Sequence, residues 1–239
     1  MKKKLLIICD SHGTDWGCNG YANLIKKSLN RYWETKIIEL PGMSIKKAIP
    51  AISGTPEIYD SILIGLGNPD IHPRIPRKFI LTLRAAGITK ARDSYFSIPP
   101  KFCTSYILRI PLFLLRIILI RIIPDFYLSL EDLEFEFREL IGKLSEKSKN
   151  ILIIPTFRVD SRLYGKHHNM RSTEINKFLQ KKFPQQLINL DKLTESQHEE
   201  NYNKDLFHFK QGYQDQISLA IAKLIEEHQL KLPNETHSN

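Results

Sequence analysis

Two short motifs at opposite ends of the sequence could together carry out nucleophilic catalysis. Near the N-terminus, the apolar run at residues 5–9 stops at Asp10 and Ser11, which places a serine hydroxyl on the turn that leaves a buried strand. Near the C-terminus, Asp205 precedes His208 by three residues, just ahead of a helical pattern. In that spacing a carboxylate can orient one imidazole nitrogen while the other accepts a proton from a nucleophile. The two motifs therefore predict a catalytic triad of Ser11, His208 and Asp205.

The order of these motifs, with serine first and Asp-x-x-His last, resembles the SGNH (GDSL-type) superfamily of esterases and acyltransferases. Asp10 and Ser11 match the first conserved block of that family, with Cys9 in place of the usual glycine. Asp205 and His208 match the last block. The resemblance implies that Ser11 is the nucleophile and that the C-terminal pair completes the triad.

The same resemblance implies an oxyanion hole. In the family, its donors are the amide of the nucleophile, a glycine after the second strand and an asparagine after the third. Gly42 follows the second predicted strand, but the third block reads Gly-Leu-Gly-Asn68-Pro69-Asp70, whereas the family has Gly-x-Asn-Asp. Registering the block on Asp70 puts Pro69, which cannot donate a hydrogen bond, at the asparagine position and leaves a hole formed only by the amides of Ser11 and Gly42. Registering it on Asn68 gives a hole formed by Ser11, Gly42 and Asn68.

Several polar residues near these blocks are further candidates. We predict substrate contacts for four of them: Asp10, Asp70, His72 and Arg74. We interpret His12, His72, His167 and His168 as loop or surface histidines that take no part in catalysis. His167 and His168 are adjacent, but no carboxylate or cysteine lies beside them at ligand spacing. We expect no metal and no cofactor.

Apolar strand patterns and helical stripes alternate along the chain, which predicts an α/β domain with a mainly parallel sheet. Strands are expected at residues 5–9, 36–40, 61–65, 151–154 and 187–190. Helices are expected near 21–29, 44–49, 129–144 and 172–183, and after the Asp-x-x-His motif. The resemblance implies a flavodoxin-like, three-layer α/β/α fold with five strands. We expect one domain over residues 1–232 and a disordered tail at 233–239.

An insertion at about residues 71–128 is much longer than a simple crossover requires. Residues 71–124 contain ten basic residues and one acid, so they alone account for the net charge of +9. Three arginines in the apolar run 107–123 argue against a transmembrane span, since each costs roughly 2.5–3.5 kcal/mol at the bilayer centre. An interfacial helix at residues 106–127 that contacts a membrane peripherally fits better. The alternative is that this helix forms a cap over the acyl pocket or a contact face in a homo-oligomer. Nucleic acid is not expected as a partner, because no binding motif is present.

The function predicted from these features is a serine-dependent carbohydrate (acetyl)esterase acting on a glycan or a lipid-linked sugar. The stretch Gly67-x-x-Asp70-x-x-Pro73-Arg74 resembles divergent members of the superfamily that are found with polysaccharide-assembly genes. A sugar O-acetyltransferase and a catalytically weakened glycan-binding protein are the alternatives. Three cysteines at unrelated spacings indicate reduced thiols, and the first apolar run is too short for a signal peptide. We therefore expect a cytoplasmic protein, located at the inner face of the membrane if the insertion binds there.

Overall fold

The central sheet has four parallel strands in the described part of the chain, which comprises residues 2–53, 57–88, 107, 109–164, 166–190 and 201–231 of a computed structural model. Its order is β2-β1-β3-β4, with β1 at Lys3–Cys9, β2 at Trp33–Glu39, β3 at Ser61–Gly65 and β4 at Ile151–Ile153. The fifth strand predicted at residues 187–190 is reduced to a single parallel bridge between Leu187 and Ile153. A five-stranded sheet is thus not confirmed.

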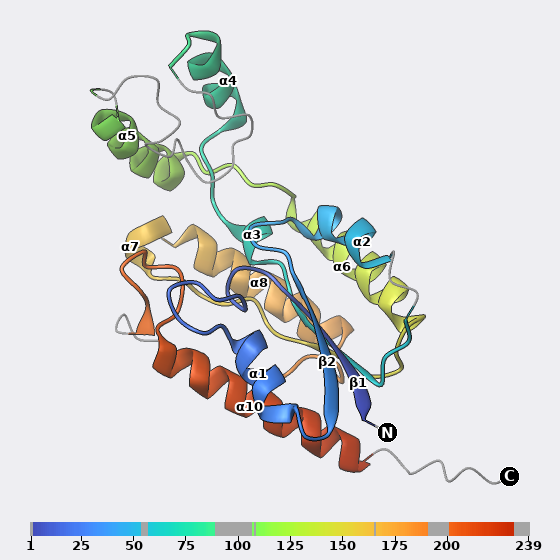
Figure 1. The fold of residues 1–239 in the computed structure, drawn as a ribbon. Coiled ribbons are helices and arrows are strands. Elements are labelled where there is room, and N and C mark those ends of the chain that lie inside the picture. The colour runs from blue at the N-terminus through green and yellow to red at the C-terminus, as the bar shows by residue number, and fades with distance from the viewer. Residues whose placement is uncertain are drawn as a thin grey trace, which may run out of the picture.

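Helices cover both faces of the sheet, as the sequence predicts (Figure 1). One face carries α1 (Tyr21–Leu29) and α10 (Gln211–Lys231). The other carries α2 (Ile45–Ser53), α6 (Leu130–Ser145) and α8 (His167–Lys182). Two apolar clusters result because successive strand residues point to opposite faces: Leu6 and Ile8 belong to one, Leu5 and Ile7 to the other. The expected three-layer α/β/α architecture is confirmed.

Helix α6 begins where the sequence predicts. The side chain of Ser129 accepts a hydrogen bond from the amide of Asp132 at 3.0 Å, which satisfies one of the free amides of the first turn. Glu131 and Asp132 also place negative charge at the positive end of the helix dipole. This cap fixes the point at which the chain returns from the insertion to the α/β body.

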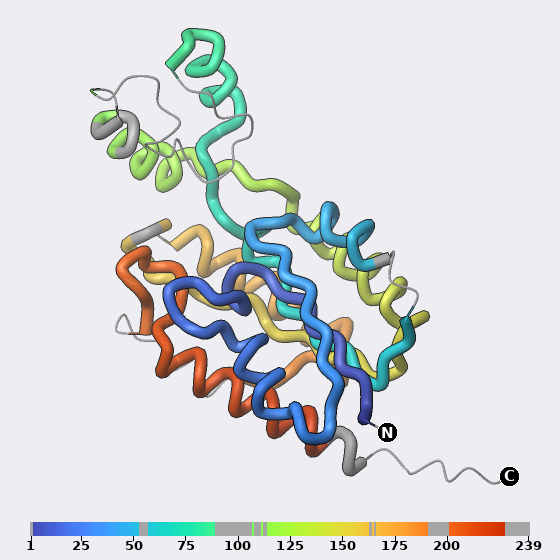
Figure 2. The backbone as a smooth tube through the Cα atoms, viewed as in Figure 1, coloured from blue at the N-terminus to red at the C-terminus, as the bar shows by residue number. Residues whose placement is uncertain are grey.

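Two helices of the insertion, α4 (Arg77–Ala85) and α5 (Arg109–Ile122), stand away from the α/β body (Figures 1 and 2). The sequence did not predict α4. Pro111 lies in the first turn of α5, where proline is tolerated. A third apolar cluster joins both helices to the body through Val159, Tyr164 and Phe207.

None of the described helices combines the length and apolar composition that crossing a membrane demands. The predicted tail at 233–239 lies outside the described residues.

Candidate active site

The Asp10–Ser11 turn and Asn68 lie together because they follow neighbouring strands. Cys9 pairs with Gly65 at the end of β1 and β3, and the amide of Asp10 donates to the Gly65 carbonyl at 2.9 Å. From β1 the chain passes to β2 on one side of the sheet and then crosses to β3 on the other. The loops diverge at this topological switch point, which is where ligands bind in open parallel sheets.

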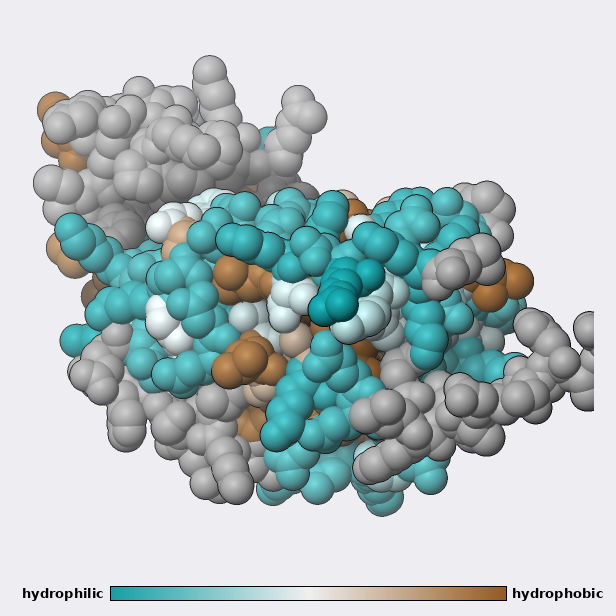
Figure 3. Space-filling view, turned by 60° about the horizontal axis from the view of Figure 1, so that its bottom comes forward, coloured by the Kyte–Doolittle hydropathy of each residue, from teal (hydrophilic) through white to brown (hydrophobic). Residues whose placement is uncertain are grey.

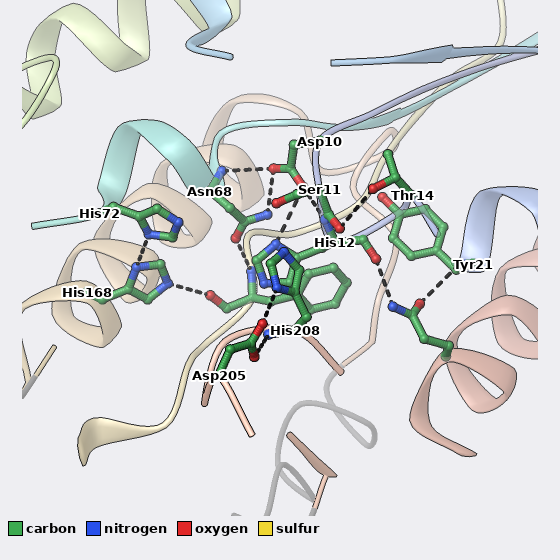
Figure 4. Close-up of polar contacts among 12 residues, drawn as sticks. Asp10, Ser11, His12, Thr14, Tyr21, Asn68, His72, His168, Asp205 and His208 are labelled. Atoms are coloured by element: carbon green, nitrogen blue, oxygen red, sulfur yellow. Dashed lines mark hydrogen bonds and ion pairs between the residues drawn. The ribbon is translucent and has the colours of Figure 1, made fainter. Parts of the chain in front are cut away.

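The buried carboxylate of Asp10 organises the turn (Figure 4). Its Oδ1 accepts from the amide of His12 at 3.0 Å, and its Oδ2 accepts from Nδ2 of Asn68 at 2.9 Å and from the Asn68 amide at 3.3 Å. Ser11 is thereby held between Asp10 and His12, which are joined by the first of these hydrogen bonds, and it is 9% exposed. Its carbonyl accepts from Oγ1 of Thr14 at 3.3 Å. The Ser11 amide and hydroxyl make no hydrogen bond to any described residue.

The side-chain amide of Asn68 is fixed at both ends. Its Oδ1 accepts from the amide of Phe157 at 2.9 Å, so its Nδ2 faces Asp10. The bond to Asp10 uses one Nδ2 hydrogen, and the other has no acceptor within the described residues. Gly67, just before it, has φ of 110°, a conformation that suits glycine. Of the two registers open in the sequence, the structure places Asn68, and not Pro69, beside the Asp10–Ser11 turn.

Gly42 lies on the turn that follows β2, next to the same switch point. The amide of Leu40 donates to the Cys9 carbonyl at 2.8 Å, which ties the end of β2 to the end of β1. The amide of Met43 donates to the Leu40 carbonyl at 3.1 Å and closes the turn, in which Gly42 has φ of 67°. A left-handed conformation at this position favours glycine over other residues.

The Asp205–His208 loop forms the predicted carboxylate–imidazole pair (Figure 4). Oδ2 of Asp205 lies 2.6 Å from Nδ1 of His208. Its Oδ1 accepts from the amides of Phe207 at 3.0 Å and His208 at 2.9 Å, so the carboxylate is held in place by its own loop. Because a carboxylate only accepts, Nδ1 carries the proton and Nε2 has a free lone pair. Nε2 is buried and has no hydrogen-bond partner in the described part of the chain.

The ionisation of this pair suits a general base. Burial lowers the pKa of His208 below the ordinary histidine value, and the hydrogen bond to Asp205 offsets part of that effect. Burial acts to raise the pKa of Asp205, but the hydrogen bonds from the His208 ring and from the Phe207 and His208 amides outweigh it and lower that pKa. At neutral pH, His208 is therefore an uncharged base beside an ionised carboxylate.

The two ends of the sequence meet in one cluster. The ring of His12, the residue after Ser11, has its centroid 5.7 Å from that of His208. Gln214 on α10 donates from Nε2 to the His12 carbonyl at 2.9 Å and accepts from the Tyr21 amide at 3.0 Å. No motif in the sequence pointed to this glutamine. No hydrogen bond joins the Ser11 hydroxyl to His208, and such bonds are often long in substrate-free enzymes.

Three histidines interpreted from the sequence as loop or surface residues are buried. His12 packs against Phe157, Phe207 and Phe209, in addition to His208. Nδ1 of His72 lies 2.8 Å from Nδ1 of His168, and Nε2 of His168 donates to the Phe157 carbonyl at 2.9 Å. Burial lowers the pKa of His72 and brings that of His168 to about 3, so this pair is uncharged. His12 and His72 lie in loops, as expected, although neither is at the surface; His168 is buried within α8, so the interpretation was wrong for His168.

The four predicted substrate contacts, Asp10, Asp70, His72 and Arg74, are each at most 2% exposed. Asp70 accepts from the Ile45 amide at 3.0 Å and holds the loop after β2; burial raises its pKa to about 6, against hydrogen bonds from Ser44 and Ile45. Arg74 donates from Nη2 to the Pro69 carbonyl at 2.6 Å and lies over the Tyr127 ring. Substrate contact by these residues stays a prediction, and their burial favours a positioning role.

Trp16 is a candidate that the sequence reasoning missed. Its ring stacks on that of His208, with centroids 4.7 Å apart and planes at 22°, yet 53% of the residue is exposed. The loop around it is held firmly: Oδ1 of Asp15 accepts from the Gly20 amide at 2.7 Å, and Sγ of Cys18 lies 3.3 Å from the Phe209 carbonyl oxygen. A lone tryptophan five residues after a serine carries no recognisable signal in a single sequence.

Across the described residues, no group of three His, Cys, Asp or Glu side chains is arranged to hold a metal ion.

Solved structures similar to this chain share one fold. A lipase/acylhydrolase from Enterococcus faecalis superposes with a TM-score of 0.62 at 14% identity, covering 95% of this chain and 96% of that one. An esterase from a Pseudoalteromonas species gives 0.57 at 13% identity, with coverage of 96% and 100%. A catalytic mutant of an acetylxylan esterase from Geobacillus stearothermophilus gives 0.53 at 12%, with coverage of 94% and 93%.

No protein-family model matches the chain, and no curated protein matches it in sequence. At this level of identity, the structural likeness establishes the fold alone. The chain has the α/β fold of the SGNH (GDSL-type) hydrolases, and the resemblance inferred from its two terminal motifs is confirmed at that level.

Proposed function

We propose that the protein is a serine-dependent ester hydrolase. The observation that carries this proposal is the Asp205–His208 pair, because the free Nε2 of His208 lies in the same cluster as the Ser11 turn. His208 is uncharged and is oriented by the ionised Asp205, as a general base requires. The SGNH-hydrolase fold, shared with proteins named as esterases and lipases, supports the same chemistry.

The proposed reaction has two halves. Nε2 of His208 takes the hydroxyl proton as Oγ of Ser11 attacks the ester carbonyl. The amides of Ser11 and Gly42 and the free Nδ2 hydrogen of Asn68 stabilise the oxyanion. As the tetrahedral intermediate collapses, His208 gives its proton to the departing alkoxide and an acyl-enzyme remains. Water, deprotonated by His208, then releases the acid and restores Ser11.

We further propose that the alcohol portion of the ester is a sugar. His208 must reach the leaving oxygen to protonate it, so the alcohol lies beside the His208 ring. Trp16 stacks on that ring and keeps about half of its surface open, so it is positioned to meet the departing group. An indole face presents a broad apolar surface on which the C–H face of a pyranose can lie. Two similar structures are named acetylxylan esterases, which supports the same substrate class.

The test compares Trp16→Ala with wild type on two acetates, a monoacetylated methyl xyloside and ethyl acetate. Stacking is worth about 1–1.5 kcal/mol, so kcat/KM for the sugar ester should fall roughly tenfold, mainly through KM. Ethyl acetate hydrolysis should change by less than about threefold, and Trp16→Phe should recover most of the loss. Trp33→Phe, which alters the buried second tryptophan, is the matched control.

Equal losses on both acetates would mean that Trp16 only shields His208 from water. A wild-type protein that hydrolyses neither ester would refute the hydrolase proposal itself. Transfer of the acetyl group to an added sugar, detected by mass spectrometry, would favour the alternative of a sugar O-acetyltransferase. That reaction shares every step as far as the acyl-enzyme and differs only in the final acceptor.

We also propose a cytoplasmic location, because Cys9 and Cys18 are both free thiols. An alkaline phosphatase fusion, which is active only outside the cytoplasm, should stay inactive. Involvement in polysaccharide assembly stays a prediction from the sequence pattern alone.

A further inference from the structure

Helix α5 has one face that is packed and one that is not. On the packed face, Ile120 is buried in the third apolar cluster with Tyr164 and Phe207. The opposite face carries four aliphatic side chains that are between 36% and 70% exposed: Leu114, Leu115, Ile118 and Ile122. Their spacing of three and four residues places them along a single side of the helix. We call these four residues the outer face of α5.

The outer face is unusual for this molecule. Single exposed aliphatic residues are ordinary in soluble proteins, but a contiguous row of them marks an interaction site. The side of the α/β body seen in Figure 3 is mostly hydrophilic, with small, separate apolar areas. Helix α5 also contains no acidic residue, so the outer face has no negative charge beside it on its own helix.

A basic pocket lies at the C-terminal end of the same helix. It has a volume of about 460 Å³ and is lined by Arg121, Ser161, Arg162, Lys166 and His167. Arg121 donates from Nη2 to the Arg162 carbonyl at 2.5 Å, and Nε2 of His167 donates to the Arg121 carbonyl at 2.8 Å. These bonds tie the end of α5 to α7 (Ser161–Tyr164) and to the start of α8. The pocket thus lies at the end of α5 that carries Ile122 of the outer face.

The charge of the pocket is largely uncompensated. Arg162 is paired with Asp160 at 2.5 Å, but neither Arg121 nor Lys166 forms an ion pair within the described residues. Lys166 and His167 stand at the start of α8, whose first turn has no acidic residue. Cations are unfavourable at that end of a helix dipole, and a bound anion would relieve the repulsion. The pocket therefore suits a phosphate group.

We propose that this region docks on an anionic phospholipid surface, with the outer face of α5 at the acyl boundary and the basic pocket on a headgroup phosphate. Only this occupant satisfies both features. A soluble phosphate would leave the aliphatic row uncovered, and a second copy of the chain would bring like charges together across a symmetric contact. With 14 residues, α5 suits a position in the plane of the interface.

Docking in this way would also favour particular substrates. The packed side of α5 shares the third apolar cluster with Phe207, which immediately precedes His208. The catalytic loop would then lie close to the membrane surface, where an ester on a lipid-linked sugar could reach it. This consequence rests on the proposed function, whereas the docking itself does not.

The test is co-sedimentation with phosphatidylglycerol vesicles, with phosphatidylcholine vesicles as the neutral comparison. One variant, Arg121→Gln with Lys166→Gln, removes pocket charge; another, Leu114→Asn with Ile118→Asn, removes part of the outer face. The matched control is Lys26→Gln with Lys27→Gln, which removes two exposed charges from α1 on the α/β body. Circular dichroism confirms the folding of each variant without reference to activity.

Wild type should bind phosphatidylglycerol and not phosphatidylcholine. The pocket variant should bind about 30-fold more weakly at low salt, because two basic side chains each contribute roughly 1 kcal/mol near an anionic surface. The outer-face variant should bind at least about tenfold more weakly, with little dependence on salt. The α1 control should bind like wild type.

Three outcomes would overturn the proposal. The first is an absence of vesicle binding by wild type, or equal binding by the pocket variant. The second is tight binding of inorganic phosphate that needs the pocket alone, with vesicle binding untouched by the outer-face variant. The third is a wild-type dimer in sedimentation that Leu114→Asn with Ile118→Asn dissociates, in the absence of vesicle binding.

Discussion

The α/β body and the α4–α5 insertion depart in opposite ways from the rule that apolar side chains are buried and polar side chains are exposed. The body buries polar groups such as Asp10, Asn68 and His168, and it satisfies them with bonds to one another and to the backbone. The insertion leaves apolar side chains such as Leu114 and Ile122 exposed. Both arrangements cost stability, and proteins retain such costs mainly where function requires them. The contrast agrees with the two proposals, which place catalysis in the body and membrane attachment in the insertion.

The largest effect should come from substitutions in the body that remove a member of the proposed triad. Ser11→Ala and His208→Ala should each lower kcat for p-nitrophenyl acetate by about 10⁵-fold or more, and Asp205→Asn by about 10⁴-fold, because triad members act as a unit. Binding to phosphatidylglycerol vesicles should not change in any of the three. A Ser11→Ala protein with wild-type turnover would show that another residue is the nucleophile.

A smaller effect is expected at the oxyanion hole. Asn68→Ala should lower kcat by roughly 100- to 1,000-fold and change KM only slightly, because its free Nδ2 hydrogen acts mainly on the transition state. Asn176→Ala is a matched control, because the Asn176 side chain also holds a loop. Its Oδ1 accepts from the Thr156 amide at 2.8 Å, and its Nδ2 donates to the Thr156 carbonyl at 2.9 Å. It should cost stability and leave kcat near wild type. An unchanged kcat in Asn68→Ala would mean that two backbone amides suffice.

The smallest effect on esterase activity is expected from substitutions in the insertion. Leu114→Asn with Ile118→Asn should hydrolyse soluble p-nitrophenyl acetate within about twofold of wild type, because both side chains are exposed and lie away from Phe207. A tenfold loss on this substrate would mean that the insertion acts on the catalytic loop through Ile120 and Phe207. The two regions would then form one functional unit.

Much of the fold could be predicted from local sequence patterns. The apolar runs gave strands β1, β3 and β4, and Ser129 with Asp132 gave the start of α6, because these signals depend on adjacent residues. The triad motifs were recognisable by their order along the chain. Helix α4 was missed because its two buried residues, Ile80 and Leu83, form only a short apolar pattern, and they pack in the third apolar cluster with residues far away in the sequence, such as Val159 and Phe207.

What the sequence left open was decided by contacts between distant segments. The register at Asn68 depends on a bond to Asp10, 58 residues away, and on the positive φ of Gly67. The burial of His72 depends on His168, 96 residues away. Trp16 became a candidate only when its ring was found on that of His208. None of these pairs leaves a periodic pattern in one sequence.

The most direct test of whether Ser11 is a reactive nucleophile is labelling with a fluorophosphonate probe, followed by peptide mass spectrometry. Wild type should be labelled at Ser11, and the labelling rate should fall with decreasing pH as His208 gains a proton. Because burial lowers the pKa of His208, the midpoint of that fall should lie below 6.5. Ser11→Ala should not be labelled, and the pocket variant Arg121→Gln with Lys166→Gln should be labelled like wild type. Absence of labelling in folded wild type, or modification of another residue in Ser11→Ala, would contradict the proposed catalytic role of Ser11.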